Sequence, residues 1–372
     1  MSVERENRED FSAPEESKRI LDELREHPPV KPVRIMNVCG SHERAVAHLG
    51  LRKALGKTLR LIPGPGCPVC VCPSRDLETA ALLALQPGVV LAAYGDLLRV
   101  PFSSPVNGAR SLAECKENGA RLHVVASPTD ARALALTYPD ESVVFFSAGF
   151  ETTTAPLAAL VSAGMPDNLS LLLSHKRTSP AVRVLLNSGE PGFDALIAPG
   201  HVSAITGADE WRFVAADFAI PVAVCGFYDL SLILGIRSLC SMIGSGKAEL
   251  DNCYPQVVKP EGNRKALELM GEVFEVCDVA WRGVGVLPLS GYRLAEPYRQ
   301  FDARVRFGLP EGSEEPEVMP EGCACHHVVM GRKTPTECPL FGTLCTPREP
   351  VGPCMVSDEG ACRIWHRYGG GY

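Results

Sequence analysis

The sequence predicts an α/β protein with two domains built on parallel sheets. Three observations lead to this fold class. Short apolar runs without alternating polarity recur between residues 34 and 225, which is typical of strands buried on both faces. Helical patterns separate many of these runs, and repeated strand–helix alternation indicates parallel sheets. After Pro288 the periodicity is lost, and proline, glycine, charge and cysteine dominate.

The predicted elements begin with an amphipathic helix over 14–27, which Pro28-Pro29 ends. Eight strands follow, at 34–38, 59–63, 89–93, 122–126, 143–147, 169–173, 196–198 and 222–225. Helices are predicted at 74–85, 129–137, 156–163, 180–186 and 208–218, with longer ones at 230–243 and 264–277. We place the break between the two domains near residues 138–142, which gives domains over 32–140 and 141–248.

Length, charge and cysteine content narrow the function. A chain of 372 residues suits two or three domains, and its net charge of −7 argues against nucleic-acid binding. No apolar run reaches the roughly 20 residues that span a bilayer, and the charged N-terminus does not resemble a signal peptide, so we expect a cytoplasmic protein without membrane contact. In such a chain, 15 cysteines indicate metal binding or redox chemistry.

Polar residues follow several predicted strands, and function in α/β domains gathers at such loops. Cys39 and His42 follow the first strand, and Cys67-Pro68-Val69-Cys70 follows the second. The Cys-x-x-Cys precedes a helix, whose N-terminus lowers a thiol pKa. The pair suits a disulfide or a shared metal, with half of a structural zinc site as the alternative. With Cys39 the three thiols suit a soft-metal site or a dithiol acting beside one.

His42 is expected to donate a hydrogen bond to the Cys39 thiolate or to a ligand beside it, with a solvated or capping residue as an equally weighted alternative. The C-terminal cysteines form a second group. Cys325, Cys338, Cys345 and Cys362 are separated by twelve, six and sixteen residues, and Cys323 and Cys354 are left over. Four thiolates suit a [4Fe–4S] cluster, and structural zinc, with His326 or His327 as a further ligand, is a near-even alternative, because the spacing matches neither the usual zinc fingers nor the bacterial ferredoxins.

Seven motifs in order resemble the hydrogenase maturation protein HypD family over residues 34–362. They read MNVCGSH, GPGCPVCV, YGDLLRVP, GFETTTAP, APGHVSAITG, WRGVGVLPLSG and CPLFGTLCTPREPVGPCMVSDEGAC. The resemblance implies a scaffold on which the iron of [NiFe]-hydrogenases receives its cyanide and carbon monoxide ligands. It implies a third domain, an iron–sulfur domain formed by 249–372 and joined by the N-terminal segment 1–31, with the two α/β domains facing a cleft.

The resemblance also assigns roles. Cys39 corresponds to the iron ligand shared with the chaperone HypC, and Cys67 with Cys70 corresponds to a redox dithiol. The spacing of Cys325, Cys338, Cys345 and Cys362 matches the family's [4Fe–4S] ligands, which favours the cluster over zinc. His42, Asp96 and Glu151 fall in matching motifs and are expected to line the same cleft. HypE is the implied cyanide donor.

The sequence departs from the family pattern at several positions. Glu43-Arg44 replaces a threonine and a second histidine, Cys72 replaces a threonine, and Ser174 begins an SHK that is NHK in the family. Two rival functions share these cysteines. One is an iron–sulfur thiol–disulfide oxidoreductase. The other is a structural zinc protein with a nucleotide-binding fold, which the incomplete P-loop ending at Lys247 makes the weaker rival.

Overall fold

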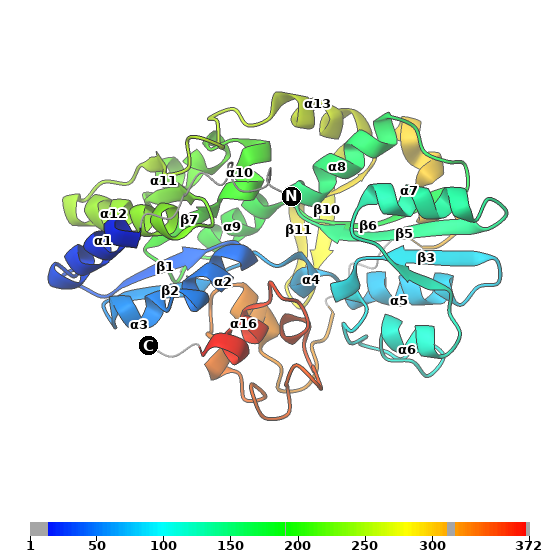
Figure 1. Ribbon diagram of the computed structural model, residues 1–372, viewed down its shortest axis with the longest axis horizontal. Coiled ribbons are helices and arrows are strands. Elements are labelled where there is room, and N and C mark those ends of the chain that lie inside the picture. Colours follow the sequence, from blue (N-terminus) through cyan, green and yellow to red (C-terminus); the bar gives the residue numbers. More distant parts are fainter. Residues whose placement is uncertain (1–13, 190, 311–316, 370–372) are drawn as a thin grey trace, which may run out of the picture.

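Two parallel sheets lie side by side in the computed structural model, which describes residues 14–189, 191–310 and 317–369 (Figure 1). Sheet A has the strand order β2-β1-β7-β8-β9 and sheet B the order β4-β3-β5-β6. Sheet A comprises β1 (Val33–Asn37), β2 (Leu59–Pro63), β7 (Ala195–Pro199), β8 (Val222–Cys225) and β9 (Leu250–Asn252). Sheet B comprises β3 (Val89–Ala93), β4 (Leu122–Val124), β5 (Ser142–Gly149) and β6 (Leu169–His175). The predicted α/β class and all eight predicted strands are therefore confirmed.

The two sheets do not divide the chain near residue 140 as expected. β3 and β5 lie on either side of that point and are hydrogen-bonded neighbours, with Val89 opposite Ser142. β1 instead pairs with β7, where Ile35 is opposite Ala195. Sheet B is thus formed by a segment inserted between β2 and β7. The apolar runs resemble one another in sequence. Which strands pair is decided by tertiary packing, and a local sequence pattern does not encode that packing.

Helices flank sheet A. They are α2 (Gly40–His48), α3 (Leu51–Leu55), α9 (Thr178–Asn187), α10 (Gly200–Thr206), α11 (Arg212–Phe218) and α12 (Asp229–Ser245). The N-terminal helix α1 (Pro14–Glu26) packs on α12 and α3, and its Ile20 and Leu24 enter the same apolar core as Leu232 and Leu51. The helix was expected to join a C-terminal domain. Instead, its apolar face packs against the helices of sheet A.

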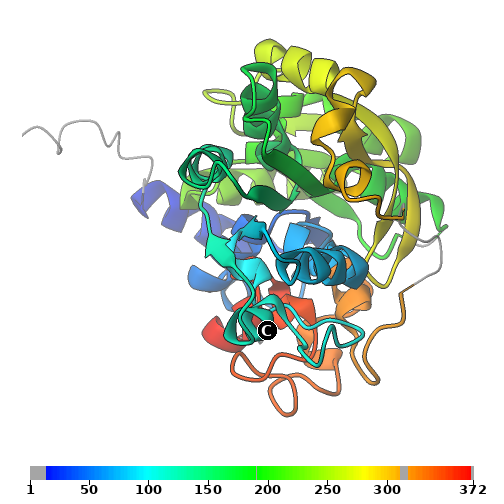
Figure 2. The same ribbon diagram turned by 90° about the vertical axis from the view of Figure 1, so that its right-hand side faces the viewer.

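Sheet B carries α5 (Ser74–Ala84), α6 (Leu112–Glu117), α7 (Pro128–Thr137) and α8 (Glu151–Ser162). Helix α13 (Arg264–Val273) packs on α8 and ends four residues earlier than predicted. The chain then forms an antiparallel hairpin of β10 (Phe274–Trp281) and β11 (Gly285–Leu294). The hairpin packs against β6 (Figure 2). β9 thus belongs to sheet A, while α13 and the hairpin pack against sheet B, so residues 249–294 do not form a separate C-terminal unit with the residues that follow.

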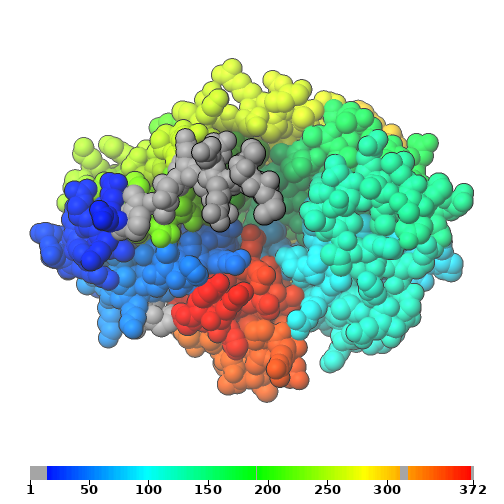
Figure 3. Space-filling view, in the orientation of Figure 1, coloured from blue at the N-terminus to red at the C-terminus, as the bar shows by residue number. Residues whose placement is uncertain are grey.

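The last described segment, 317–369, has little regular structure. It contains α15 (Cys325–Val329), α16 (Ala361–Tyr368) and short 3-10 turns, and α14 (Ala303–Arg306) precedes it. α16 packs on α2, and α15 packs on α4 (Pro68–Val71). Figure 3 shows this segment, in orange and red, against N-terminal residues in blue. Within the described ranges, no helix has the length and apolar character needed to cross a membrane.

Candidate functional site

Cys39 lies two residues after the end of β1 and forms the N-cap of α2. Two glycines let other segments approach it. A Cβ on Gly66 would lie 2.3 Å from the Cys39 nitrogen, and one on Gly40 would lie 2.4 Å from the Glu359 Cβ. The Gly40 N–H also donates to the Gly66 carbonyl at 3.0 Å. The loops that carry Cys39, Cys67 and Glu359 are therefore in backbone contact, and only glycine fits at these positions.

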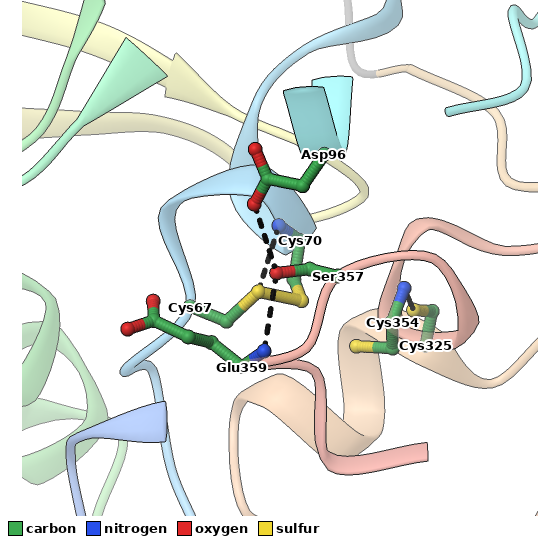
Figure 4. The surroundings of a disulfide bond; sticks show 7 residues. All are labelled: Cys67, Cys70, Asp96, Cys325, Cys354, Ser357 and Glu359. Carbon is green, nitrogen blue, oxygen red and sulfur yellow. Dashed lines mark hydrogen bonds between the residues drawn. A yellow bond between two sulfur atoms is a disulfide. The ribbon is translucent and has the colours of Figure 1, made fainter. Parts of the chain in front are cut away.

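Cys67 and Cys70 form a disulfide (Figure 4). Cys67 is the N-cap of the short helix α4, and Pro68 occupies its first turn, where a missing N–H costs nothing. The helical turn brings the two sulfurs together, and the Cys70 N–H donates to the Cys67 sulfur at 3.1 Å. Of the alternatives left open by the sequence, the structure holds the disulfide.

Cys39 and this disulfide line one small cavity together with Cys354 and Glu359. Its volume is about 10 Å³, which is roughly the space of one water molecule. Cys67 and Cys70 are buried, while Cys39 is half-buried. The three thiols that the sequence grouped are thus brought together. A much larger cavity of about 1060 Å³ lies elsewhere, along β6 and the hairpin, and Cys39 does not line it.

Burial dominates the electrostatics of this cavity. Burial and the neighbouring Glu359 raise the pKa of Cys39 to about 12, although the N–H groups of Ser41 and His42 lower it in part. Burial and Asp96 raise the pKa of Glu359 to about 7. Near neutral pH Cys39 is therefore a protonated thiol. A bound cation would stabilise the thiolate and displace the proton, as metal binding to cysteine requires.

His42 does not contact Cys39 through its side chain, contrary to the expected hydrogen bond. Its Nε2 lies 3.0 Å from the carbonyl oxygens of Cys225 and Gly226, at the end of β8. The ring stacks on Phe227 with centroids 4.7 Å apart. Burial lowers the pKa of His42 to about 4. The neutral imidazole therefore fixes α2, and with it Cys39, to the neighbouring strand of sheet A.

Asp96 and Glu151 have different surroundings. Asp96 follows β3 and accepts a hydrogen bond from Ser357 at 3.2 Å, and the Ser357 hydroxyl in turn accepts from the Glu359 N–H (Figure 4). Glu151 begins α8 and accepts from the Thr178 N–H and hydroxyl, each at 2.9 Å. Asp96 therefore braces the loop that carries Glu359, whereas Glu151 fixes the start of α9 and does not line the cavity of Cys39.

A second cavity is lined by six cysteines. It also has a volume of about 10 Å³, and its apolar wall includes Leu340, Phe341 and Met355. All four predicted cluster ligands contribute, and so do the two leftover cysteines: Cys323, Cys325, Cys338, Cys345, Cys354 and Cys362. Cys354 lines this cavity and that of Cys39. The two thiol groups that are far apart in sequence are therefore adjacent in space.

The donor set of this second cavity fits a [4Fe–4S] cluster. All six cysteines are buried. Backbone N–H groups donate to three of the expected ligands: Ala324 to Cys338 at 3.5 Å, Val351 to Cys345 at 3.3 Å and Cys354 to Cys325 at 3.3 Å. Such bonds tune cluster potentials. Across the described residues, no three metal-binding side chains converge to hold a single ion. A [4Fe–4S] cluster does not require such convergence, because it takes one thiolate per iron.

Sequence reasoning missed a buried polar network beside Cys39. Both Glu43 carboxylate oxygens lie 2.7 Å from Arg52 Nη2. The Asn37 amide and the Trp365 indole N–H donate to the same carboxylate at 2.9 and 2.5 Å. The departure from the family pattern at Glu43 was the available signal. Cys72 and Ser174, two further departures, face each other, and the Ser174 hydroxyl is 3.4 Å from the Cys72 thiol.

The fold and the two thiol groups define an α/β protein in which a disulfide adjoins a cavity lined by cysteines. The family model described as HypD, hydrogenase formation hypA family, matches residues 15–369. Relatives include the hydrogenase maturation factor HypD2 of Bradyrhizobium diazoefficiens, 40% identical over 92% of this chain and 90% of its own length. HypD of Azotobacter vinelandii is 39% identical over 92% and 90%, and HypD of Escherichia coli is 37% identical over 97% of each chain. The chain belongs to the HypD family.

Proposed function

We propose that this protein is a maturation factor of [NiFe]-hydrogenases that holds iron while cyanide and carbon monoxide ligands are added. The observation that carries the proposal is the shared cavity of Cys39 and the Cys67–Cys70 disulfide, which adjoins the six-cysteine cavity through Cys354. A metal site, a two-electron dithiol and a one-electron centre in this order suit chemistry that must control the oxidation state of iron.

Cys39 is the proposed anchor for iron. Its position at the N-terminus of α2 places backbone N–H groups at the sulfur, which stabilise a thiolate once a cation is present. A thiolate also pushes electron density onto iron, and this favours binding of cyanide and carbon monoxide. Cys39 is half-buried, so a second thiolate from HypC can reach the same iron. The iron is cargo, and it leaves with its ligands.

Cys67 and Cys70 are proposed to act as a redox dithiol. Oxidation of two thiols to the disulfide releases two electrons and two protons, and the disulfide present here is the oxidised form. Its position in the cavity of Cys39 places this reservoir beside the iron. Glu359 lines the same cavity and, with its pKa near 7, can exchange a proton there at neutral pH.

Cys325, Cys338, Cys345 and Cys362 are proposed to hold a [4Fe–4S] cluster, which when bound supplies or accepts one electron at a time. Cys323 and Cys354 are then free thiols beside it. The remaining parts of the proposal are a cyanide supply from HypE, action in the cytoplasm, and an iron site in the cleft between the two α/β domains, where water is excluded until the ligands are in place.

The proposal is tested by maturation in a host that lacks its own HypD. The wild-type chain should restore hydrogenase activity, and Cys39→Ala should abolish it. Cys240→Ala is the matched control, because Cys240 lies on α12 and packs, partly buried, against the core of sheet A, and it should restore activity as the wild type does. Restoration by Cys39→Ala would contradict the proposed role of this thiol.

The disulfide beside a cysteine-lined cavity also favours an iron–sulfur thiol–disulfide oxidoreductase as a second candidate. The two functions differ in their need for a partner. An oxidoreductase would turn over a disulfide substrate catalytically without HypC, whereas a scaffold would reduce at most one equivalent per chain. Steady-state turnover of a model disulfide by the purified protein distinguishes them.

A further inference from the structure

Two cysteines outside both thiol groups lie opposite each other on sheet A. β8 and β9 run parallel, and Val224 is the register partner of Asn252. Cys225 and Cys253 each follow by one residue, and the Cys253 N–H continues the ladder by donating to the Val224 carbonyl at 2.9 Å. They therefore occupy the next paired position. Adjacent strands are about 4.8 Å apart, and paired side chains point to the same face.

The two sulfurs point into the same part of the core. Cys225 is buried and Cys253 partly buried in the apolar cluster that sheet A forms with α12. Gly235 of α12 makes room for the Cys225 sulfur, because a Cβ at this position would lie 2.2 Å from it. A hydrogen bond with the Cys253 thiol and burial together raise the pKa of Cys225. The thiols are thus in mutual contact while both are free.

We propose that Cys225 and Cys253 are a second dithiol pair, which a small-molecule disulfide such as oxidised glutathione converts to a disulfide joining β8 and β9. The strand spacing of about 4.8 Å lies within the roughly 4.4–6.8 Å between Cα atoms that disulfides tolerate. The pair is separated in space from Cys67 and Cys70. Cys67 follows β2, and in sheet A the strands β1 and β7 lie between β2 and the strands β8 and β9 that precede the pair. It does not depend on the proposed hydrogenase function.

The exchange begins at Cys253, which is the more exposed of the two thiols. Its S–H donates to the Asp251 carboxylate, with 3.5 Å between sulfur and Oδ2. The Cys253 thiolate attacks one sulfur of the oxidant, the S–S bond of the oxidant breaks, and the departing thiolate takes up the proton that Cys253 has lost and leaves as a thiol. Cys225 then attacks the Cys253 sulfur and displaces the second thiol, which takes the Cys225 proton. Two cysteines are oxidised and one small disulfide is reduced to two thiols.

The bridge would act on the segment that seats His42. The carbonyl of Cys225 accepts from His42, and the next residue, Gly226, is tied to Cys253 through Ser231. The Ser231 hydroxyl accepts from the Gly226 N–H at 2.8 Å and donates to the Cys253 carbonyl at 3.0 Å. β9 is the edge strand of sheet A. Oxidation would therefore fix this edge and the loop behind Cys39 with one covalent bond.

Peptide mapping tests the proposal on the full-length protein. The reduced protein is incubated with oxidised glutathione, its remaining thiols are alkylated, and it is digested with trypsin without reduction. Cys225 is the one cysteine of the tryptic peptide 213–237, and Cys253 is the one cysteine of 248–264. We expect these two peptides to appear joined by a disulfide. Their recovery as separate peptides, alkylated or carrying glutathione, or a link from Cys253 to Cys240 would overturn the proposal.

Two variants add a matched comparison. Cys240→Ser removes a thiol of the same core and should leave the linked peptides unchanged. Cys225→Ser should stop the reaction at the mixed disulfide between Cys253 and glutathione. If Cys225→Ser does not fold, the wild-type peptide map decides alone. Alkylation of Cys253 in folded Cys225→Ser, with no glutathione attached, would contradict its role as the attacking thiol.

Discussion

Removing the Glu43 carboxylate should destabilise the protein strongly. Glu43 and Arg52 form an ion pair at 2.7 Å whose side chains are only 2% and 4% exposed. The Arg52 guanidinium also lies 4.6 Å from the centre of the Trp365 ring, and its Nε donates to the Leu61 carbonyl. In Glu43→Ala this cation stays buried without a counter-charge, and two further donors, on Asn37 and Trp365, lose their acceptor.

The expected cost follows from this geometry. Breaking a buried pair by removing one partner costs about 3–5 kcal/mol. Asp217→Ala is the matched control, because its pair with Arg183 has the similar length of 3.0 Å but side chains that are 50% and 46% exposed. An exposed pair contributes about 1 kcal/mol or less. Urea unfolding measures the cost of breaking each pair in four proteins: wild type, Glu43→Ala, Glu43→Gln and Asp217→Ala. The cost of Glu43→Gln is expected to lie between those of Asp217→Ala and Glu43→Ala.

The result that would refute this reasoning is a Glu43→Ala cost no larger than that of Asp217→Ala. Arg52 would then reach water or another partner without strain. The network also connects the two ends of the chain, since Trp365 belongs to α16 and Glu43 to α2. We therefore expect α16 of folded Glu43→Ala to be cut faster by protease than that of Asp217→Ala.

Three further predictions concern the two cavities. Gly66→Ala should lower the free energy of unfolding by about 1–3 kcal/mol, because the new Cβ overpacks against the Cys39 backbone. In the control Gly244→Ala a Cβ meets nothing within 4 Å, and the higher helix propensity of alanine should raise the free energy of unfolding by about 1 kcal/mol. Equal urea midpoints for the two variants would contradict this prediction. Because burial raises the pKa of Glu359 to about 7 from its ordinary 4.5, the folded protein binds the proton more tightly, and stability falls as pH rises between these values, by at most about 1.4 kcal/mol per pH unit. Glu359→Gln should flatten this part of the stability–pH curve, and an unchanged slope would exclude Glu359 as its source. The iron and sulfide content of single Cys→Ser variants should distinguish cluster ligands from the other cysteines of the cavity. We expect loss of the cluster in the variants of Cys325, Cys338, Cys345 and Cys362, and retention in those of Cys323 and Cys354. The opposite result at any position would reassign the role of that cysteine.

Much of the fold could be predicted because its signals are local. Apolar runs such as 89–93 and 143–147 coincide with strands buried on both faces, and these need no information from distant residues. The pairing of β1 with β7 could not be predicted, since many strand orders bury the same runs equally well. The hairpin at 274–294 was missed because Phe274–Cys277 continues the periodicity of the preceding helix.

The candidate site was predictable where its residues share a motif. Cys39, Cys67 and Cys70 follow adjacent parallel strands. Because the carboxyl ends of parallel strands meet at one edge of a sheet, this position alone predicts that the three cysteines lie together. Glu359 and Cys354 come from a segment about 280 to 320 residues further along the chain, and the glycine at position 40 lets its backbone reach this edge. His42 was misjudged because a histidine three residues after a cysteine fits a ligand contact as well as the backbone anchor that it provides here.

Infrared spectroscopy of the complex co-purified with HypC tests the central claim most directly. Iron-bound cyanide and carbon monoxide have stretching bands in a spectral window that protein groups leave clear. If Cys39 anchors the iron, the wild-type complex shows these bands, the Cys240→Ala complex shows them equally, and the Cys39→Ala complex lacks them while remaining folded. Bands that persist at wild-type intensity in Cys39→Ala would contradict the account and place the iron on another ligand.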